Sequence, residues 1–178
     1  FLGGFGSLNL GHNHPRILAA LEQVSTMPNL LQASMGMAAS TLAHNLAQIT
    51  PGKLNNTFFC NSGAEAVEGA IKLARIATGR TRIISCKSGF HGKTLGSLSV
   101  TGREKYQKGF EPLLPDCSMV SFCGLNELEE QLKTRDVAGF IVEPIQGEGG
   151  IIVPEQGYLK EVEVLCRRYG ALLIVDEI

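Results

Sequence analysis

The sequence lacks an excess of charge of either sign. Its 178 residues include 16 basic and 17 acidic side chains, which gives a formal net charge of −1. Because attraction to phosphate groups drives non-specific binding to nucleic acids and anionic membranes, this balance argues against both partners. A hydrophobic content of 44% with 19% charged residues is ordinary for a soluble globular protein.

Long apolar runs and a signal peptide are also missing. No run approaches the roughly 20 residues that a membrane-spanning helix needs. The first residues do not have the organisation of a secretory signal. The chain opens on Phe1 and not on Met, so we expect further residues before it in the natural protein.

Cysteine spacing excludes the common frameworks. The cysteines are odd in number and form no CxxC pair, and three of them lie in or beside apolar runs. We therefore expect reduced thiols in the core, not disulfides or metal ligands, and a cytoplasmic location. His12 and His14 lie two apart, but no spacing of other ligands completes a set, so no metal site is predicted. The cysteines are Cys60, Cys86, Cys117, Cys123 and Cys166.

Apolar periodicity predicts an alternation of strands and helices. Short, nearly continuous apolar runs indicate strands at residues 57–60, 82–86, 117–122, 137–142 and 172–175. Amphipathic spacing indicates helices at residues 15–24, 35–49, 63–78, 127–133 and 158–169, with a long loop-rich stretch at residues 87–116. Such an alternation is typical of a parallel sheet covered by helices on both faces.

Polar residues follow several of the predicted strands. Asn61 and Ser62 come after the first strand, Glu143 after the fourth and Asp176 after the last. In open α/β sheets, ligands bind beyond the carboxyl ends of the strands, so these side chains are expected to meet at one crevice.

The stretch Asn61-Ser62-Gly63-Ala64-Glu65 joins a predicted strand to a predicted helix. Ser62 and Glu65 have the spacing of a capping box, and Gly63 leaves room for a ligand to approach the backbone. Free amides and the helix dipole make a competent phosphate site, although a well-capped helix explains the same residues. Neither GxxxxGK[ST] nor a GxGxxG after a strand is present, so nucleotide binding of those kinds is unsupported.

Two later loops also carry unusual residues. Phe90 and His91 lie between glycines after a predicted strand, where an aromatic ring can lie on a planar ligand or plug the sheet edge. Glu143 and Glu148 lie five apart in a Pro/Gly-rich loop. They can serve in acid–base chemistry, bind a metal or pair with cations from elsewhere.

Taken in this order, the stretches GGFGSLNLGHNHP, FFCNSGAEAVEGAIKLAR, GFHGKTLGSLSVTG, VEPIQGEGG and LLIVDEI resemble the class III (ornithine-type) aminotransferases. These enzymes use pyridoxal 5′-phosphate (PLP). The resemblance covers essentially the whole chain and is strongest to the acetylornithine, ornithine and putrescine aminotransferases.

The resemblance implies an aspartate-aminotransferase-like fold (fold type I), a three-layer α/β/α arrangement with a mostly parallel sheet that is incomplete in this chain. Residues 1–34 would belong to an N-terminal segment of the small domain or interface, and residues 35–178 to the N-terminal portion of the large PLP-binding domain. The complete enzyme would be a cytoplasmic homodimer. It would move an amino group from an amine or ω-amino acid (ornithine, acetylornithine, putrescine or 4-aminobutyrate) to a 2-oxo acid such as 2-oxoglutarate.

The same resemblance assigns cofactor-binding roles to five residues. Gly63 and Ala64, with Ser62 beside them, match the turn whose amides hold the PLP phosphate. Phe90 matches the aromatic side chain that stacks on the pyridine ring, and His91 occupies the adjoining position.

It also assigns roles to three acids. Asp176 matches the catalytic aspartate bonded to the pyridine nitrogen, where a carboxylate favours the protonated ring. Glu143 matches a second catalytic acid near the ring. Glu148 matches the substrate-binding acid that pairs with an arginine of the C-terminal domain.

One part of the family's machinery has no match. The lysine that binds the cofactor covalently lies well after the DEI segment in the family, and none of the chain's lysines corresponds to it. The resemblance therefore implies an N-terminal fragment that is inactive alone and associates through its open sheet edge. Two alternatives stay open, a class III racemase or aminomutase and a non-catalytic domain with the same fold. The lysines are Lys53, Lys72, Lys87, Lys93, Lys105, Lys108, Lys133 and Lys160.

Overall fold

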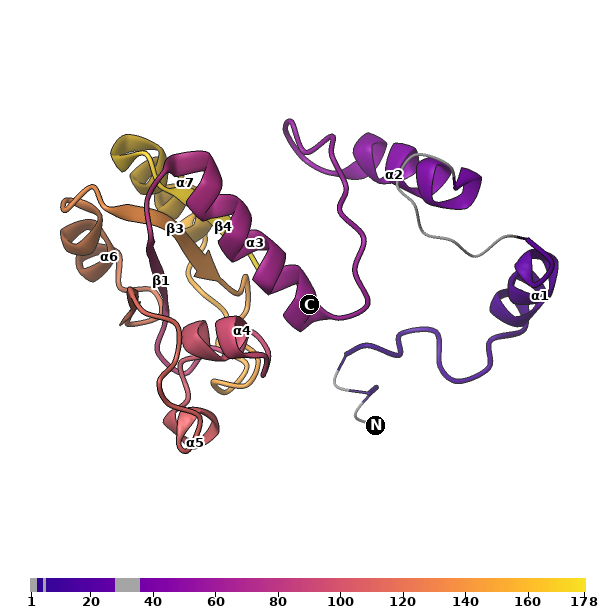
Figure 1. Cartoon of the computed structure of the whole chain (residues 1–178), viewed down its shortest axis with the longest axis horizontal. Coiled ribbons are helices and arrows are strands. Elements are labelled where there is room, and N and C mark those ends of the chain that lie inside the picture. The colour runs from indigo at the N-terminus through magenta and orange to yellow at the C-terminus, as the bar shows by residue number, and fades with distance from the viewer. Residues whose placement is uncertain (1–2, 5, 28–35) are drawn as a thin grey trace. The chain divides into compact units, whose positions relative to one another are not determined.

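A computed structural model describes residues 3–4, 6–27 and 36–178 of the chain (Figure 1). The chain divides into two compact units, Phe1–Phe58 and Phe59–Ile178. The division at residue 34 that the sequence suggests concerns domains of a complete enzyme, and it stays a prediction. Within the described ranges, no helix has both the length and the apolar character that a bilayer span requires.

The first unit contains two helices, α1 (Pro15–Val24) and α2 (Met37–Ile49). Pro15 begins α1 because its fixed φ suits a first helical turn, where no amide donor is needed. The predicted start of the second helix, Met35, lies outside the described residues. Neither helix contains a buried residue.

The second unit is built on a parallel sheet with strand order β2-β1-β3-β4. The strands are β1 (Arg82–Cys86), β2 (Cys117–Val120), β3 (Val137–Val142) and β4 (Leu172–Val175). The predicted bounds of β1, β3 and β4 are confirmed. Strand β2 ends two residues earlier than predicted, because the amide of Ser121 donates to the carboxylate of Glu127 (2.8 Å) and not to a neighbouring strand.

Helices cover both faces of this sheet (Figure 1). Helices α3 (Gly63–Thr78) and α4 (Leu95–Val100) pack on the face that includes Ile83 and Ile141. Helices α6 (Leu125–Leu132) and α7 (Tyr158–Tyr169) pack on the other face, against Ile84, Phe140 and neighbouring side chains. Successive strand residues alternate between the two cores, as the pleat requires. The predicted three-layer α/β/α fold is confirmed.

The predicted strand at residues 57–60 is wrong. Thr57–Cys60 has no regular structure, and the Phe58 side chain is 79% exposed. An apolar run becomes a strand only where a neighbouring strand satisfies its backbone groups, and no neighbour pairs with this one among the described residues. Asn61 and Ser62 therefore precede α3 without following a strand.

The predicted loop at residues 87–116 contains two short helices, α4 and α5 (Glu104–Gln107). Cysteine burial also differs from expectation. All five cysteines lie among the described residues and are unpaired; Cys86 and Cys166 are buried, but Cys60 and Cys123 are exposed and do not belong to the core.

Candidate functional site

The candidate site lies where the carboxyl ends of β1, β3 and β4 meet the beginning of α3. Figure 1 shows the C-terminus of the chain at the first turn of α3. A Cβ atom built on Gly63 would lie 2.7 Å from Cδ1 of Ile178, so only a residue without a side chain fits there with Ile178 in place. Parallel strands place their carboxyl ends along one edge, which brings the loops after them together.

Asp176 and His91 form a buried pair at the centre of this site. Asp176 Oδ2 lies 2.7 Å from His91 Nδ1, and the two side chains are 6% and 0% exposed. The amide of Asp176 donates to the carbonyl of Val142 (2.9 Å), which extends the β3–β4 pairing into the site. The amide of Ile178 donates to Asp176 Oδ1 (3.1 Å). The Asp176 carboxylate is therefore held in one orientation.

His91 is anchored through its backbone, whereas its second ring nitrogen makes no hydrogen bond among the described residues. The His91 amide donates to Thr101 Oγ1 (2.9 Å), which fixes the loop after β1. His91 Nε2 is buried and has no hydrogen-bond partner in the described residues. If the shared hydrogen lies on Nδ1, Nε2 of a neutral imidazole is an acceptor without a donor. A buried polar atom without a partner is costly and often marks a functional site.

The first turn of α3 supplies free backbone donors. Ser62 is the N-cap and accepts a hydrogen bond at its Oγ from the Glu65 amide (3.3 Å), and Glu65 accepts from the Asn61 amide (2.6 Å). The Ser62 half of the predicted capping box is thereby confirmed, whereas the Glu65 side chain binds the Asn61 amide and not the Ser62 amide. The amides of Gly63 and Ala64 come before the Ala66 amide, which is the first donor within the helix and bonds to the Ser62 carbonyl (3.1 Å). We find no acceptor for either amide in the described part of the chain.

Phe90 and Glu143 link the loops after β1 and β3. Glu143 Oε2 accepts from the Phe90 amide (3.2 Å) and Oε1 accepts from the Gly147 amide (3.1 Å). The Phe90 ring is half-buried and packs edge-on against Tyr106, with ring centroids 5.7 Å apart. Glu143 is thus a carboxylate that orders two loops, a role that its position after a strand did not reveal.

Glu148 is engaged by two residues that the sequence did not point to. Its Oε2 accepts from the Tyr106 hydroxyl (3.1 Å) and lies 3.5 Å from Arg103 Nη1. Arg103 Nη1 also donates to the backbone carbonyl of Glu148. More than 40 residues separate these partners in the sequence, so no local pattern could have predicted the contacts.

Glu68 on α3 was also not identified from the sequence as a residue of the site. Its Oε1 accepts from Thr94 Oγ1 (2.7 Å) and from the amides of Gly96 (2.8 Å) and Ser97 (3.3 Å). One helical turn earlier, Ala64 lies against Gly92, where an added Cβ would be 2.9 Å from the Ala64 Cβ. The i, i+4 spacing of Ala64 and Glu68 is the signal that places both on the face toward this loop.

Hydrogen bonds of Gln146 hold the two ends of the loop that carries Glu148. Gln146 is buried, its side-chain Nε2 donates to the Lys87 carbonyl (3.0 Å), and its backbone exchanges two hydrogen bonds with Ile152. Gly149 lies so close to the Gln146 side chain that a Cβ would overlap it. This arrangement, the Gln146 staple, ties residues 146–152 to the end of β1.

Nucleophilic cysteine chemistry and metal binding find no support here. Burial, together with the nearby Glu143 carboxylate and Cys123, raises the pKa of the Cys86 thiol to about 12, so the thiol stays neutral. Across the described ranges, no three His, Cys, Asp or Glu side chains group as metal ligands.

Solved structures with this architecture define the class. The ornithine aminotransferase of Toxoplasma gondii, described with partial occupancy of PLP at its active site, superposes with a TM-score of 0.87 and 34% identity, covering 98% of this chain and 43% of that one. An amine transaminase from an uncultivated Pseudomonas species, solved in its PLP-bound form, gives a TM-score of 0.88 and 30% identity, covering 99% and 47%. The fold is that of the fold-type I aminotransferases.

The family follows from the sequence comparison. The profile of the family "Aminotransferase class-III" matches residues 1–178. Aminotransferase PigE of Serratia sp. (strain ATCC 39006) is 44% identical over 180 residues, which cover 99% of this chain and 21% of PigE. The chain belongs to the class III aminotransferase family. The predictions of this family and of PLP as its cofactor are confirmed. The chain spans 21% of PigE and less than half of the two solved transaminases.

Proposed function

We propose that this chain is the N-terminal part of a PLP-dependent aminotransferase. The donor would be an amine or ω-amino acid of the ornithine, acetylornithine, putrescine or 4-aminobutyrate type, and the acceptor a 2-oxo acid such as 2-oxoglutarate. The observation that carries the proposal is the buried Asp176–His91 pair at the carboxyl ends of the strands, beside the unused amides of α3. Relatives named as ornithine aminotransferase and amine transaminase support the substrate class.

Asp176 and His91 would serve the ring nitrogen of the cofactor. When bound, PLP supplies an electron sink at its protonated ring for the electron pair left after the substrate Cα–H bond breaks. A buried carboxylate stabilises that protonated nitrogen by charge pairing. His91 and the Ile178 amide hold the carboxylate in place, so Asp176 can meet the nitrogen without reorganisation.

The residues at the other end of the site fit a phosphate and a planar ring. The amides of Gly63 and Ala64 point from a helix N-terminus, where partial positive charge favours an anion, and the Ser62 hydroxyl lies beside them. Phe90 would cover one face of the ring. Glu143 would act through its hydrogen bonds to the Phe90 and Gly147 amides, and Glu148 would face the substrate.

Other parts of the proposal concern the complete protein. We propose that the covalently binding lysine lies outside residues 1–178, so that this chain alone does not transaminate. The complete protein would be a cytoplasmic homodimer. The proposed function is tested on the complete protein by two measurements. An absorption band of covalently bound PLP near the visible edge and 2-oxoglutarate-dependent amine transfer would both support it. Interconversion of substrate isomers without an acceptor would instead indicate a racemase or aminomutase.

The sharpest test changes Asp176 to Asn in the complete protein. Asn keeps the size but loses the charge that favours a protonated ring nitrogen. We expect the single-turnover rate to fall by about 10²-fold or more, while PLP affinity changes much less. The exposed Asp136, which pairs with Arg82 at 3.7 Å, offers a matched control, and Asp136→Asn should stay within about twofold of the parent. An unchanged single-turnover rate in Asp176→Asn would refute the proposed role of Asp176 at the ring nitrogen.

A further inference from the structure

Thr101, the residue that ends helix α4, is buried and its side chain contacts the loop of the candidate site. Its Oγ1 accepts a hydrogen bond from the His91 amide (2.9 Å) and lies 3.0 Å from the carbonyl oxygens of Gly92 and Ser97. A hydroxyl has one hydrogen and two lone pairs, so it can accept from the amide and donate to a carbonyl at the same time. We find no second acceptor for the His91 amide in the described part of the chain.

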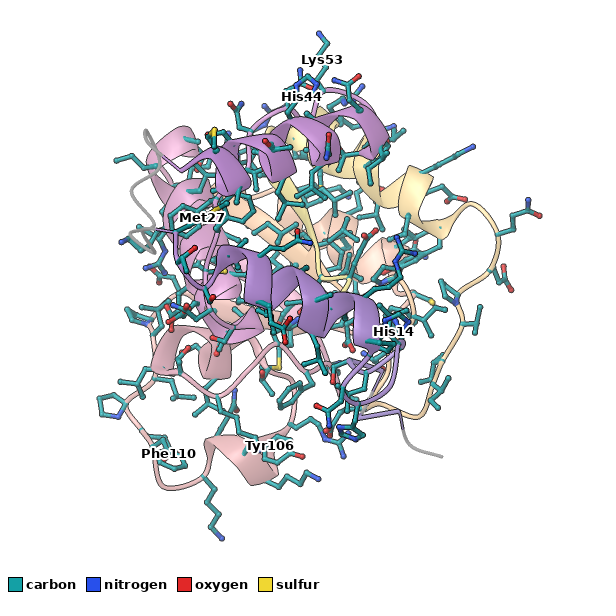
Figure 2. The ribbon with its side chains drawn as sticks, turned by 90° about the vertical axis from the view of Figure 1, so that its right-hand side faces the viewer. His14, Met27, His44, Lys53, Tyr106 and Phe110 are labelled. Carbon is teal, nitrogen blue, oxygen red and sulfur yellow. The ribbon has the colours of Figure 1, made fainter. Side chains whose placement is uncertain are left out.

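The backbone around Thr101 is itself held by two neighbouring segments. The amide of Gly102 donates to the carbonyl of Gly89 (2.9 Å), which lies in the same loop as His91. Gln107 belongs to the short helix α5, on which Figure 2 labels Tyr106, and its Nε2 donates to the Thr101 carbonyl (3.0 Å). Because its own backbone is fixed, Thr101 can fix the residues that its hydroxyl binds.

The position of the His91 ring opposite Asp176 depends on this anchor. His91 lies in a loop, so neither a helix nor a strand holds its backbone. Its ring is fully buried, and Nδ1 lies 2.7 Å from Asp176 Oδ2. The backbone of Asp176 is held separately, by the carbonyl of Val142 (2.9 Å). The short contact therefore requires both backbones to be in place, and Thr101 supplies the anchor on the His91 side.

We propose that Thr101 is a positioning residue whose hydroxyl holds the His91 backbone where the imidazole meets Asp176. The inference rests on the proposed function for the role of Asp176 at the cofactor ring. Loss of the hydroxyl leaves the buried His91 amide without an acceptor, which costs free energy and favours a shifted loop. A shifted loop lengthens the hydrogen bond between His91 and Asp176, and the carboxylate then loses the orientation in which it meets the ring nitrogen.

The experiment removes the hydroxyl in two ways in the complete protein. Thr101→Ala leaves a small gap, whereas Thr101→Val keeps the size of the side chain. The first readout is the proton NMR resonance of the hydrogen shared by His91 Nδ1 and Asp176 Oδ2, recorded without cofactor and identified by its loss in His91→Gln. Hydrogens in short hydrogen bonds resonate far downfield, so we expect both variants to move this resonance upfield or to broaden it through exchange with water.

The second readout is the behaviour of the PLP-loaded protein. In both variants we expect the Kd for PLP to rise about 5- to 10-fold and kcat to fall about 10-fold, while the KM for the amine stays within about twofold. This split distinguishes an effect on the chemical step from an effect on substrate binding. Thr101→Ser, which keeps the hydroxyl, should retain the resonance and most of kcat.

Ser99→Ala is the matched control for a purely structural role. The Ser99 hydroxyl is also buried near the end of α4, where it donates to the Leu95 carbonyl (2.6 Å) and accepts from the Leu114 amide (2.8 Å). Its loss should lower the melting temperature about as much as Thr101→Ala does, but it should leave the resonance and kcat unchanged.

The inference is overturned if the resonance keeps its position in both Thr101→Ala and Thr101→Val, if Thr101→Ser loses it as well, or if Ser99→Ala moves it equally. A change confined to Thr101→Val would indicate steric pressure from the added methyl group and would also overturn the inference. A complete protein without amine transfer would refute the proposed function, while the resonance would still decide whether Thr101 positions His91.

Discussion

Asp176 is a carboxylate that the fold has removed almost completely from water. Burial of such a group is expensive unless hydrogen bonds replace the lost hydration. The His91 ring and the Ile178 amide supply those bonds, each within 3.1 Å. At the scale of single residues, the site is thus assembled by groups that the chain brings together over a separation of 85 positions.

Gly92 combines a positive φ with close neighbours around the position of an added Cβ. Its φ of +118° is unfavourable for any L side chain, and an added Cβ would lie 2.7 Å from Ser97 Oγ and 3.1 Å from the Ala64 Cα. We expect Gly92→Ala to lower the free energy of unfolding by about 2–4 kcal/mol, as measured by urea denaturation.

The matched control is Gly109→Ala. Gly109 also has a positive φ, +92°, but nothing lies within 4 Å of the position that an added Cβ would take, so only the backbone strain applies. We expect a loss of about 1 kcal/mol there. Equal losses at the two glycines would show that the close approach of Gly92 to Ala64 contributes nothing.

The sequence predicted which loops meet, but not which side chains pair. Placing Asp176, Glu143 and the Phe90 loop at one edge needs only the rule for parallel strands, and the structure brings all three together. The partners of Glu148 could not be predicted, because a contact between Tyr106 and Glu148 depends on how two irregular loops fold. The cofactor and substrate roles of these residues stay predictions.

At the scale of elements, helix α3 holds the site at two points. Its first turn offers free amides, and Glu68 binds the beginning of α4 through Thr94, Gly96 and Ser97. The loop that carries Phe90 and His91 lies directly before these residues, so α3 fixes its position relative to the amides.

Glu68→Ala tests this coupling in the complete protein. Loss of the carboxylate leaves two α4 amides without an acceptor and frees the loop, so we expect PLP affinity to fall by about 10-fold in an equilibrium titration followed by absorbance. Glu68→Gln, which keeps an acceptor oxygen, should retain most of the affinity. Glu163→Ala on the exposed face of α7 serves as the control. If Glu68→Ala binds PLP as tightly as that control, α3 does not position the loop.

Element prediction succeeded where sequence pattern and burial agree. The bounds of α3, α7, β1, β3 and β4 were predicted correctly, because their apolar spacing matches the faces that they bury. Helix α4 was missed because five of its six residues are buried, which leaves no polar face to reveal a helical period. The segment at residues 57–60 was misassigned because its composition suits a strand but its backbone has no neighbour to pair with.

At the scale of the whole molecule, both units present apolar side chains to solvent. Ile17 and Leu21 of α1 are 45% and 57% exposed, and Ile76 of α3 is 82% exposed. Strand β4 lies at an edge of the described sheet, where unpaired backbone groups favour pairing with another chain.

We therefore expect the chain, produced alone, to self-associate. Light scattering at micromolar concentration should report a mass above that of one chain, 19.1 kDa. Leu172→Lys adds a charge to the half-exposed start of the edge strand and should shift the population toward monomer. A monodisperse monomer of the unmodified chain would contradict this expectation.

The Gln146 staple has a kinetic consequence for Glu148. Because the loop is fastened to the carbonyl of Lys87 and closed by Ile152, its backbone has little freedom to swing. Exchange of partners at Glu148 would then require only rotation about side-chain bonds, which takes picoseconds to nanoseconds at exposed positions. Rearrangement of the Glu148 side chain would consequently proceed without a slow transition of the loop backbone.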